Sequence, residues 1–172
     1  MIQNSKIIIM AIDIGGASEN GITIMNEREQ ILYTEAYPYV KKYGKGHHRR
    51  NISQHIKELV QQYGVQRIIV ERVKLFRGNN ISHLSNITSL WGICVGILDA
   101  VQGLCEVYDV EVRTWKSQIL NNISKNKEFS INYVKLMYHM DMGEHQADSV
   151  CIAIYGIRNW MRMDEKQNIT KD

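Results

Sequence analysis

The sequence has little of several features that would indicate other classes of protein. Pro38 is the single proline among 172 residues, and no run of about 18 apolar residues could form a transmembrane helix. The first residues lead directly into an apolar segment with no cleavage site, so we expect no signal peptide. These absences predict a cytoplasmic protein without a membrane partner.

Cysteines are few and odd in number: Cys94, Cys105 and Cys151 all lie in apolar stretches. This pattern predicts reduced core residues, as expected for a cytosolic protein. Lys and Arg number 21 against 18 Asp and Glu, a net charge of +3 that is too small to indicate nucleic-acid binding alone. Basic residues do crowd residues 41–50 (KKYGKGHHRR), which contain no acid and which we expect to form a loop. A solvated face is the alternative interpretation of that cluster.

Apolar periodicity predicts five strands and five helices. The expected strands cover residues 6–14, 21–25, 30–39, 65–73 and 104–110. The expected helices cover residues 51–63, 80–102, 113–121, 130–139 and 143–162. Asn20-Gly21 is expected to be a turn, and Asn51 with Gln54 is expected to begin the first helix. The order predicts an α/β fold with a five-stranded mixed sheet flanked by helices, in one domain over residues 1–163 with a polar tail over 164–172.

Three acids stand where apolar residues are expected. Asp13 interrupts the first apolar strand, Glu71 closes an Ile-Ile-Val strand, and Asp148 lies among apolar residues of the last helix. An unpaired buried carboxylate costs several kcal/mol, so such acids are usually paired or bind a cation. The alternative is that each acid lies at the end of its element and reaches solvent.

Carboxylate oxygens with few other donors suit Mg²⁺, with Mn²⁺ as a substitute. Two ions about 3.5–4 Å apart could hold both the attacking and the leaving oxygen in phosphodiester cleavage. His145 and Glu144 lie three and four residues before Asp148, so either could share its helix face. The residues alone do not choose between them, and we favour His145.

Three segments carry a family resemblance. Residues 11–15 (AIDIG), 69–73 (IVERV) and 145–153 (HQADSVCIA) resemble, in order and spacing, the signatures of the RuvC Holliday-junction resolvases. These enzymes belong to the RNase H-like nuclease superfamily, and the resemblance covers roughly residues 6–160. The motif sequences are similar to those of bacteriophage-encoded members from lactococcal phages. This similarity would place the protein in the cytoplasm of a bacterial host.

The resemblance implies a homodimer that binds four-way and other branched DNA and makes paired nicks with two Mg²⁺ ions per active site. Asp13, Glu71 and Asp148 match the family's acids, and His145 matches a fourth position that is Asp in many members. Glu144 could supply the missing carboxylate. The helix over residues 80–102 resembles the family's dimer helix. Whether a host helicase is also a partner is left open.

The resemblance also implies DNA contacts. Two basic segments match the family's, one around Arg113 and Lys116 and one around Lys125 and Lys127. Many members carry an aromatic wedge three residues after the Glu, where this chain has Lys74. The expected DNA-binding residues are therefore Lys74, Phe76, Arg77, Arg113, Lys116, Lys125 and Lys127. Phe76 could serve as the wedge instead, or the wedge could be absent, so we expect a weaker or altered preference for cleavage sequence than in bacterial members.

Other functions fit parts of the same pattern. Residues 13–16 (DIGG) also resemble the first phosphate loop of sugar kinases and actin-like ATPases, but no second such loop is present. An RNase H-type enzyme acting on RNA–DNA hybrids would share the fold and the metals. A junction-binding protein without cleavage is the non-enzymatic alternative.

Overall fold

The computed structural model describes residues 7–15, 19–40, 42, 44–72, 81–121 and 128–169, with no side-chain description at 81–87 and 161–169. Its elements in chain order are β1 (Ile8–Ile14), β2 (Glu19–Asn26), β3 (Ile31–Pro38), α1 (Gly44–Tyr63), β4 (Arg67–Glu71), α2 (Ile81–Val101), β5 (Glu106–Val110), α3 (Val112–Ile119), α4 (Glu128–Tyr138) and α5 (Glu144–Ile169). Among the described residues, no helix is long and apolar enough to cross a membrane.

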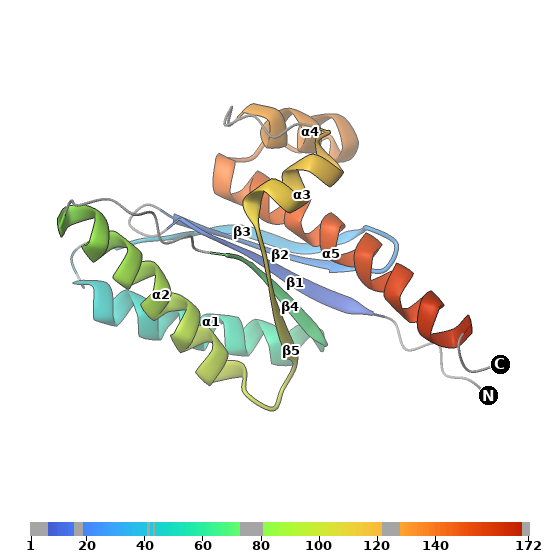
Figure 1. The fold of residues 1–172 in the computed structure, drawn as a ribbon. Helices are drawn as coiled ribbons and strands as arrows, with labels where there is room; N and C mark the ends of the chain where they lie inside the picture. The colour runs from blue at the N-terminus through green and yellow to red at the C-terminus, as the bar shows by residue number, and fades with distance from the viewer. Residues whose placement is uncertain are drawn as a thin grey trace.

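The five strands form one mixed sheet in the order β3-β2-β1-β4-β5. The first three strands pair antiparallel. Strand β4 pairs in parallel with β1, and β5 pairs in parallel with β4. Helices α1 and α2 cover one face, while α3, α4 and α5 lie on the other (Figure 1). The α/β fold with a five-stranded mixed sheet is therefore confirmed.

Alternation along the strands divides the core between the two faces. On β1, Ile9 and Ala11 pack with α5, whereas Met10 and Ile12 pack with α1 and α2. Successive side chains of a strand point to opposite faces, so Asp13 points to the α5 face. On β4, Ile69 packs with α5, which places Glu71 two residues later on that face as well.

The first helix begins earlier than the sequence predicted. We expected residues 41–50 to form a loop, but α1 begins at Gly44, and Asn51 lies inside the helix rather than at its start. Buried His48 anchors the added turns by packing its ring against Tyr37 and Tyr39, at centroid distances of 5.9 and 4.8 Å. This contact joins segments distant in sequence, which a local helix rule does not detect.

Two further boundaries were wrong. Asn20-Gly21 was expected to be a turn, but both residues lie in β2, paired with Ile14 and Asp13. The last helix was expected to end near residue 162, but α5 continues to Ile169, through most of the expected polar tail. Residues 161–167 (MRMDEKQ) are mostly good helix formers, which explains the extension.

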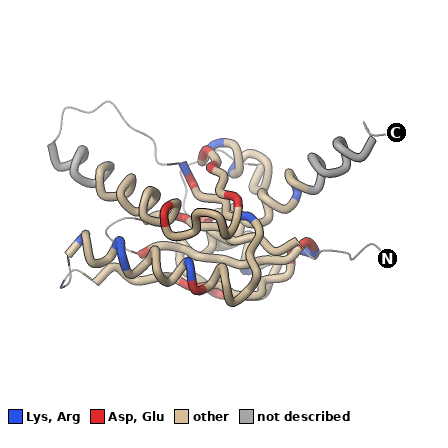
Figure 2. The backbone as a smooth tube through the Cα atoms, turned by 90° about the horizontal axis from the view of Figure 1, so that it is seen from below, with Lys and Arg blue, Asp and Glu red and all other residues tan. Residues whose placement is uncertain are grey.

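Charged residues of both signs are interspersed along the described chain (Figure 2). This mixture agrees with the small net charge.

Candidate active site

The candidate site lies where β1 and β4 end beneath the start of α5. The parallel register between these strands runs to the pair Ile12–Val70, and Asp13 and Glu71 are the next residue on each strand. Asp13 is 5% exposed and Asp148, in the second turn of α5, is 8% exposed. Two adjacent strand ends and one helix thus bring three acids, distant in sequence, to one face of the sheet.

Glu71 is held by a fully buried tryptophan. The Trp115 indole Nε1 donates a hydrogen bond to Glu71 Oε2 at 2.9 Å, and the Trp115 side chain has no exposed surface. The sequence did not predict a role for Trp115, because the bond joins positions 44 apart, on α3 and β4. The only signal was a tryptophan directly before Lys116 in the basic segment.

The acids perturb one another electrostatically. Burial, followed by the charge of Asp13 and more weakly that of Asp148, raises the pKa of Glu71 to about 8, although the Trp115 hydrogen bond and Lys116 oppose the shift. Burial raises the pKa of Asp148 to about 6, and Asp13 adds to that shift. The three carboxyl groups therefore lie within electrostatic reach of one another, as expected for carboxylates that share one site.

His145 is paired with the first acid. Its Nδ1 lies 2.7 Å from Asp13 Oδ2, and this hydrogen bond raises the pKa of His145. Glu144 is partly buried, and its charge raises the pKa values of both His145 and Asp148. The structure therefore shows a direct contact with Asp13 for His145, the residue that we favoured although the sequence alone did not choose.

Among the described residues that were expected to bind DNA, Lys116 lies beside the acids. Its Nζ lies 3.9 Å from Asp148 Oδ2, and the side chain is only 14% exposed. The same ammonium lies 5.1 Å from the centroid of the Trp115 ring. Arg113, on the same helix, is exposed. The other expected DNA contacts, Lys74, Phe76, Arg77, Lys125 and Lys127, lie outside the described residues.

The donor chemistry of the site suits a divalent cation. The buried Oδ1 of Asp148 has no hydrogen-bond partner among the described residues, and the neighbouring donors are carboxylate oxygens, as Mg²⁺ prefers. Within the described chain, however, no three His, Cys, Asp or Glu side chains converge closely enough to hold one ion. The acids are gathered on one face but do not form a closed coordination shell.

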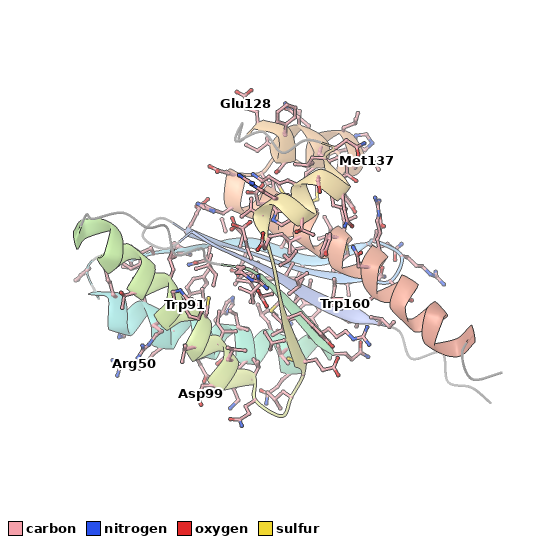
Figure 3. The ribbon with its side chains drawn as sticks, in the orientation of Figure 1. Arg50, Trp91, Asp99, Glu128, Met137 and Trp160 are labelled. Carbon is pink, nitrogen blue, oxygen red and sulfur yellow. The ribbon has the colours of Figure 1, made fainter. Side chains whose placement is uncertain are left out.

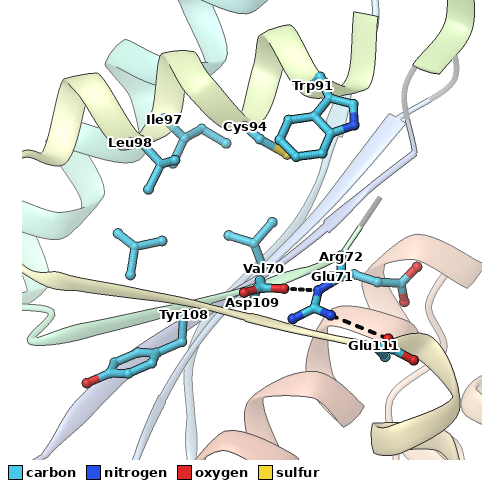
Figure 4. Close-up of a pocket in the computed structure, with 11 residues that line it drawn as sticks. Val70, Glu71, Arg72, Trp91, Cys94, Ile97, Leu98, Tyr108, Asp109 and Glu111 are labelled. Atoms are coloured by element: carbon cyan, nitrogen blue, oxygen red, sulfur yellow. Dashed lines mark hydrogen bonds and ion pairs between the residues drawn. The ribbon is translucent and has the colours of Figure 1, made fainter. Parts of the chain in front are cut away.

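A groove of about 730 Å³ opens beside Glu71, between α2 and the edge strand β5 (Figure 4). Trp91 and Leu98 line it from α2, and Tyr108 lines it from β5. Arg72 forms ion pairs with Asp109 and Glu111 at its rim.

Comparison with solved structures identifies the fold. Two structures of Thermus thermophilus RuvC, one of them in complex with Holliday junction substrate, superpose with a TM-score of 0.70. They are 15% and 16% identical to this chain, and each match covers 90% of this chain and 96% of the other. The yeast mitochondrial Holliday junction resolvase Ydc2 matches with a TM-score of 0.64 and 14% identity, over 95% of this chain and 82% of that chain.

No family model matches the sequence, and no curated protein matches it. At these identities, the solved structures establish a shared RNase H-like fold of the RuvC type.

Proposed function

We propose that the chain is a structure-selective endodeoxyribonuclease that resolves Holliday junctions and related branched DNA. The observation that carries this proposal is the meeting of Asp13, Glu71 and Asp148 on one face of the sheet, within electrostatic reach of one another. The likeness to RuvC and Ydc2 supports the choice of substrate. RuvC itself has been solved on a Holliday junction.

Mg²⁺, or Mn²⁺ in its place, would be held by oxygens of Asp13, Glu71 and Asp148, with two ions per site. Bound there, it would supply the Lewis acidity and charge neutralisation that phosphodiester hydrolysis requires. Support comes from the raised pKa values of Glu71 and Asp148, which reflect burial of the carboxyl groups first and the charge of the neighbouring acids second. A divalent cation would offset that negative charge.

The remaining polar residues of the site orient the acids and offer positive charge. Trp115 fixes one oxygen of Glu71, and His145 fixes one oxygen of Asp13. The raised pKa of His145 increases its cationic fraction near neutral pH, which suits a group placed beside a DNA phosphate. The Lys116 ammonium would also contact phosphate, with Arg113 on the outer side of the same helix.

The other DNA contacts remain proposals from sequence. Lysines 125 and 127, together with Lys74 and Arg77, would neutralise phosphates, and such binding weakens as salt rises. Phe76 would serve as the aromatic wedge at the junction centre. We expect weaker dependence on cleavage sequence than in bacterial members of the family.

A homodimer through α2 would place two sites on one junction. Trp91, Val95 and Leu98 are 47%, 56% and 49% exposed, and their spacing of four and three residues puts them on one side of the helix. Trp91 can be located on α2 in Figure 3. An isologous dimer would match the two-fold symmetry of a four-way junction and allow paired cuts.

A panel of DNA substrates tests the proposed function. The purified protein in Mg²⁺ is given a four-way junction, a fork, a plain duplex and an RNA–DNA hybrid. We expect paired nicks on the junction, weaker cutting of the fork and none of the duplex. Preferred cutting of the hybrid would indicate an RNase H-type enzyme, and tight junction binding without any nick would indicate a non-cleaving binding protein.

A further inference from the structure

Four polar side chains lie together where α5 begins on β2 and β3. Thr23 Oγ1 is 2.7 Å from Ser149 Oγ and 3.0 Å from Thr34 Oγ1. Gln146 Nε2 donates to Thr34 Oγ1 at 3.3 Å, and Ser149 Oγ donates to the Gln146 carbonyl at 2.8 Å. Thr23 and Ser149 have no exposed surface, although their neighbours on α5 are apolar.

The donors in this group can be assigned by counting hydrogens. A hydroxyl has one hydrogen, and that of Ser149 is used on the Gln146 carbonyl. Thr23 must therefore donate to Ser149, and Thr34 must donate to Thr23. Because the Gln146 amide donates to Thr34, the bonds form a closed ring that begins and ends at Gln146. Such a ring leaves every hydroxyl hydrogen bonded, and its members polarise one another.

The ring of hydrogen bonds lies next to the candidate site on both β2 and α5. On β2, Thr23 is two residues after Gly21, which pairs with Asp13 across the sheet. On α5, Ser149 directly follows Asp148, and Gln146 directly follows His145. Backbone approaches closely here too, since a Cβ on Gly21 would lie 1.8 Å from the His145 carbonyl oxygen.

We propose that the hydroxyl bridge from Thr23 to Ser149 is a positioning device that sets the rotation of α5 on the sheet. A shift of one residue along a helix turns each side chain by about 100° and moves it about 1.5 Å. Such a shift would present Glu144 or Gln146 to Asp13 in place of His145. The hydrophobic effect is non-directional, whereas a hydrogen bond loses its energy within small changes of distance and angle. This inference rests on the proposed function, because it assigns the bridge a role in that site.

Matched variants separate positioning from simple stability. Thr23→Val keeps the shape of the side chain and removes the hydroxyl, whereas Thr23→Ser keeps the hydroxyl. Ser149 stays bonded to the Gln146 carbonyl in both variants. Ile154→Val is the control, because Ile154 is fully buried on the same helix and takes no part in the ring. Melting temperature, Mn²⁺ affinity without DNA by calorimetry, and kcat and KM on a four-way junction are measured for each.

We expect Thr23→Val to weaken Mn²⁺ binding and lower kcat by about tenfold, the usual effect of removing a group that orients metal ligands, while KM for DNA stays unchanged. Thr23→Ser should restore both values. Ile154→Val should lower the melting temperature without altering either one.

Wild-type Mn²⁺ affinity and kcat in Thr23→Val would overturn the positioning role and leave the proposed function intact. A wild-type protein that neither binds Mn²⁺ nor cuts the junction would overturn the proposed function, and the positioning role with it.

Discussion

His145 Nδ1 lies 2.7 Å from Asp13 Oδ2, so the start of α5 and the end of β1 are joined at the centre of the candidate site. The sequence left two residues, His145 and Glu144, for the fourth position beside the acids. This hydrogen bond makes His145 the residue that contacts Asp13.

His145→Ala should therefore lower the junction cleavage rate by about a hundredfold, within the range for a lost acid–base or charge-stabilising group. Glu144→Gln should have a clearly smaller effect, because His145 is bonded directly to Asp13, whereas the charge of Glu144 contributes to the pKa values of His145 and Asp148 more weakly than other groups do. Single-turnover rates on one junction at saturating protein compare the two variants. The reverse order of effects would assign the fourth position to Glu144.

Stability without metal should fall as pH rises. The folded-state pKa of Glu71 is raised from 4.5 to about 8 and that of Asp148 from 3.8 to about 6, so the folded chain holds protons that the unfolded chain releases. That proton-linked stability is complete below pH 4 and is lost as pH rises towards 8. The raised pKa of His145 acts in the same direction, with its contribution lost above pH 6.5.

Mg²⁺ should consequently raise the melting temperature more at pH 8 than at pH 5.5, because it binds the ionised carboxylates. Thermal unfolding with Mg²⁺ and with EDTA at both pH values measures this difference. Glu71→Gln, which removes one titrating ligand, is the control and should reduce the pH dependence. If Mg²⁺ raised the melting temperature of the wild type equally at both pH values, the proposal that it binds the ionised carboxylates would be contradicted.

Gly21→Ala should impair both folding and cleavage. A Cβ at Gly21 would meet the His145 carbonyl oxygen at 1.8 Å and the Gln146 nitrogen at 2.9 Å, so α5 would have to move away from β2. Overpacking of this kind costs about 1–3 kcal/mol or more. Gly46→Ala is the matched control, because Gly46 is exposed in the first turn of α1 and has nothing within 4 Å of a Cβ. Chemical denaturation should show a lower free energy of unfolding for Gly21→Ala and an unchanged or higher one for Gly46→Ala. Equal free energies of unfolding in the two variants would contradict the close approach of α5 to Gly21.

A charge on the exposed side of α2 should produce monomers. Trp91→Glu places a carboxylate at the centre of the proposed apolar interface, where it would be buried without a partner. Leu136→Glu is the control, since Leu136 is 73% exposed on α4 rather than α2. Sedimentation equilibrium should give a dimer for wild type and Leu136→Glu and a monomer for Trp91→Glu. A monomeric wild type would contradict the dimer proposal.

The sheet and the acids were predictable because their signals are local. A buried strand has an apolar run, and an acid that interrupts it is visible without knowledge of its neighbours, as for Asp13 and Glu71. The bond from Trp115 to Glu71 and the packing of His48 on Tyr37 depend on elements brought together by folding. Gly21 resembled a turn residue, but its lack of a side chain is explained by the α5 backbone above it.

Cleavage of a four-way junction by Asp13→Asn tests the central claim most directly. The substitution keeps the size of the side chain and removes one negative charge from the proposed metal site. With each strand labelled in turn, wild-type protein in Mg²⁺ should make paired nicks in opposed strands. Asp13→Asn should bind the junction equally well but cut it on the order of a thousandfold more slowly, since several kcal/mol of transition-state stabilisation are lost. Cleavage by Asp13→Asn at the wild-type rate would contradict the assignment of Asp13, Glu71 and Asp148 as the catalytic acids.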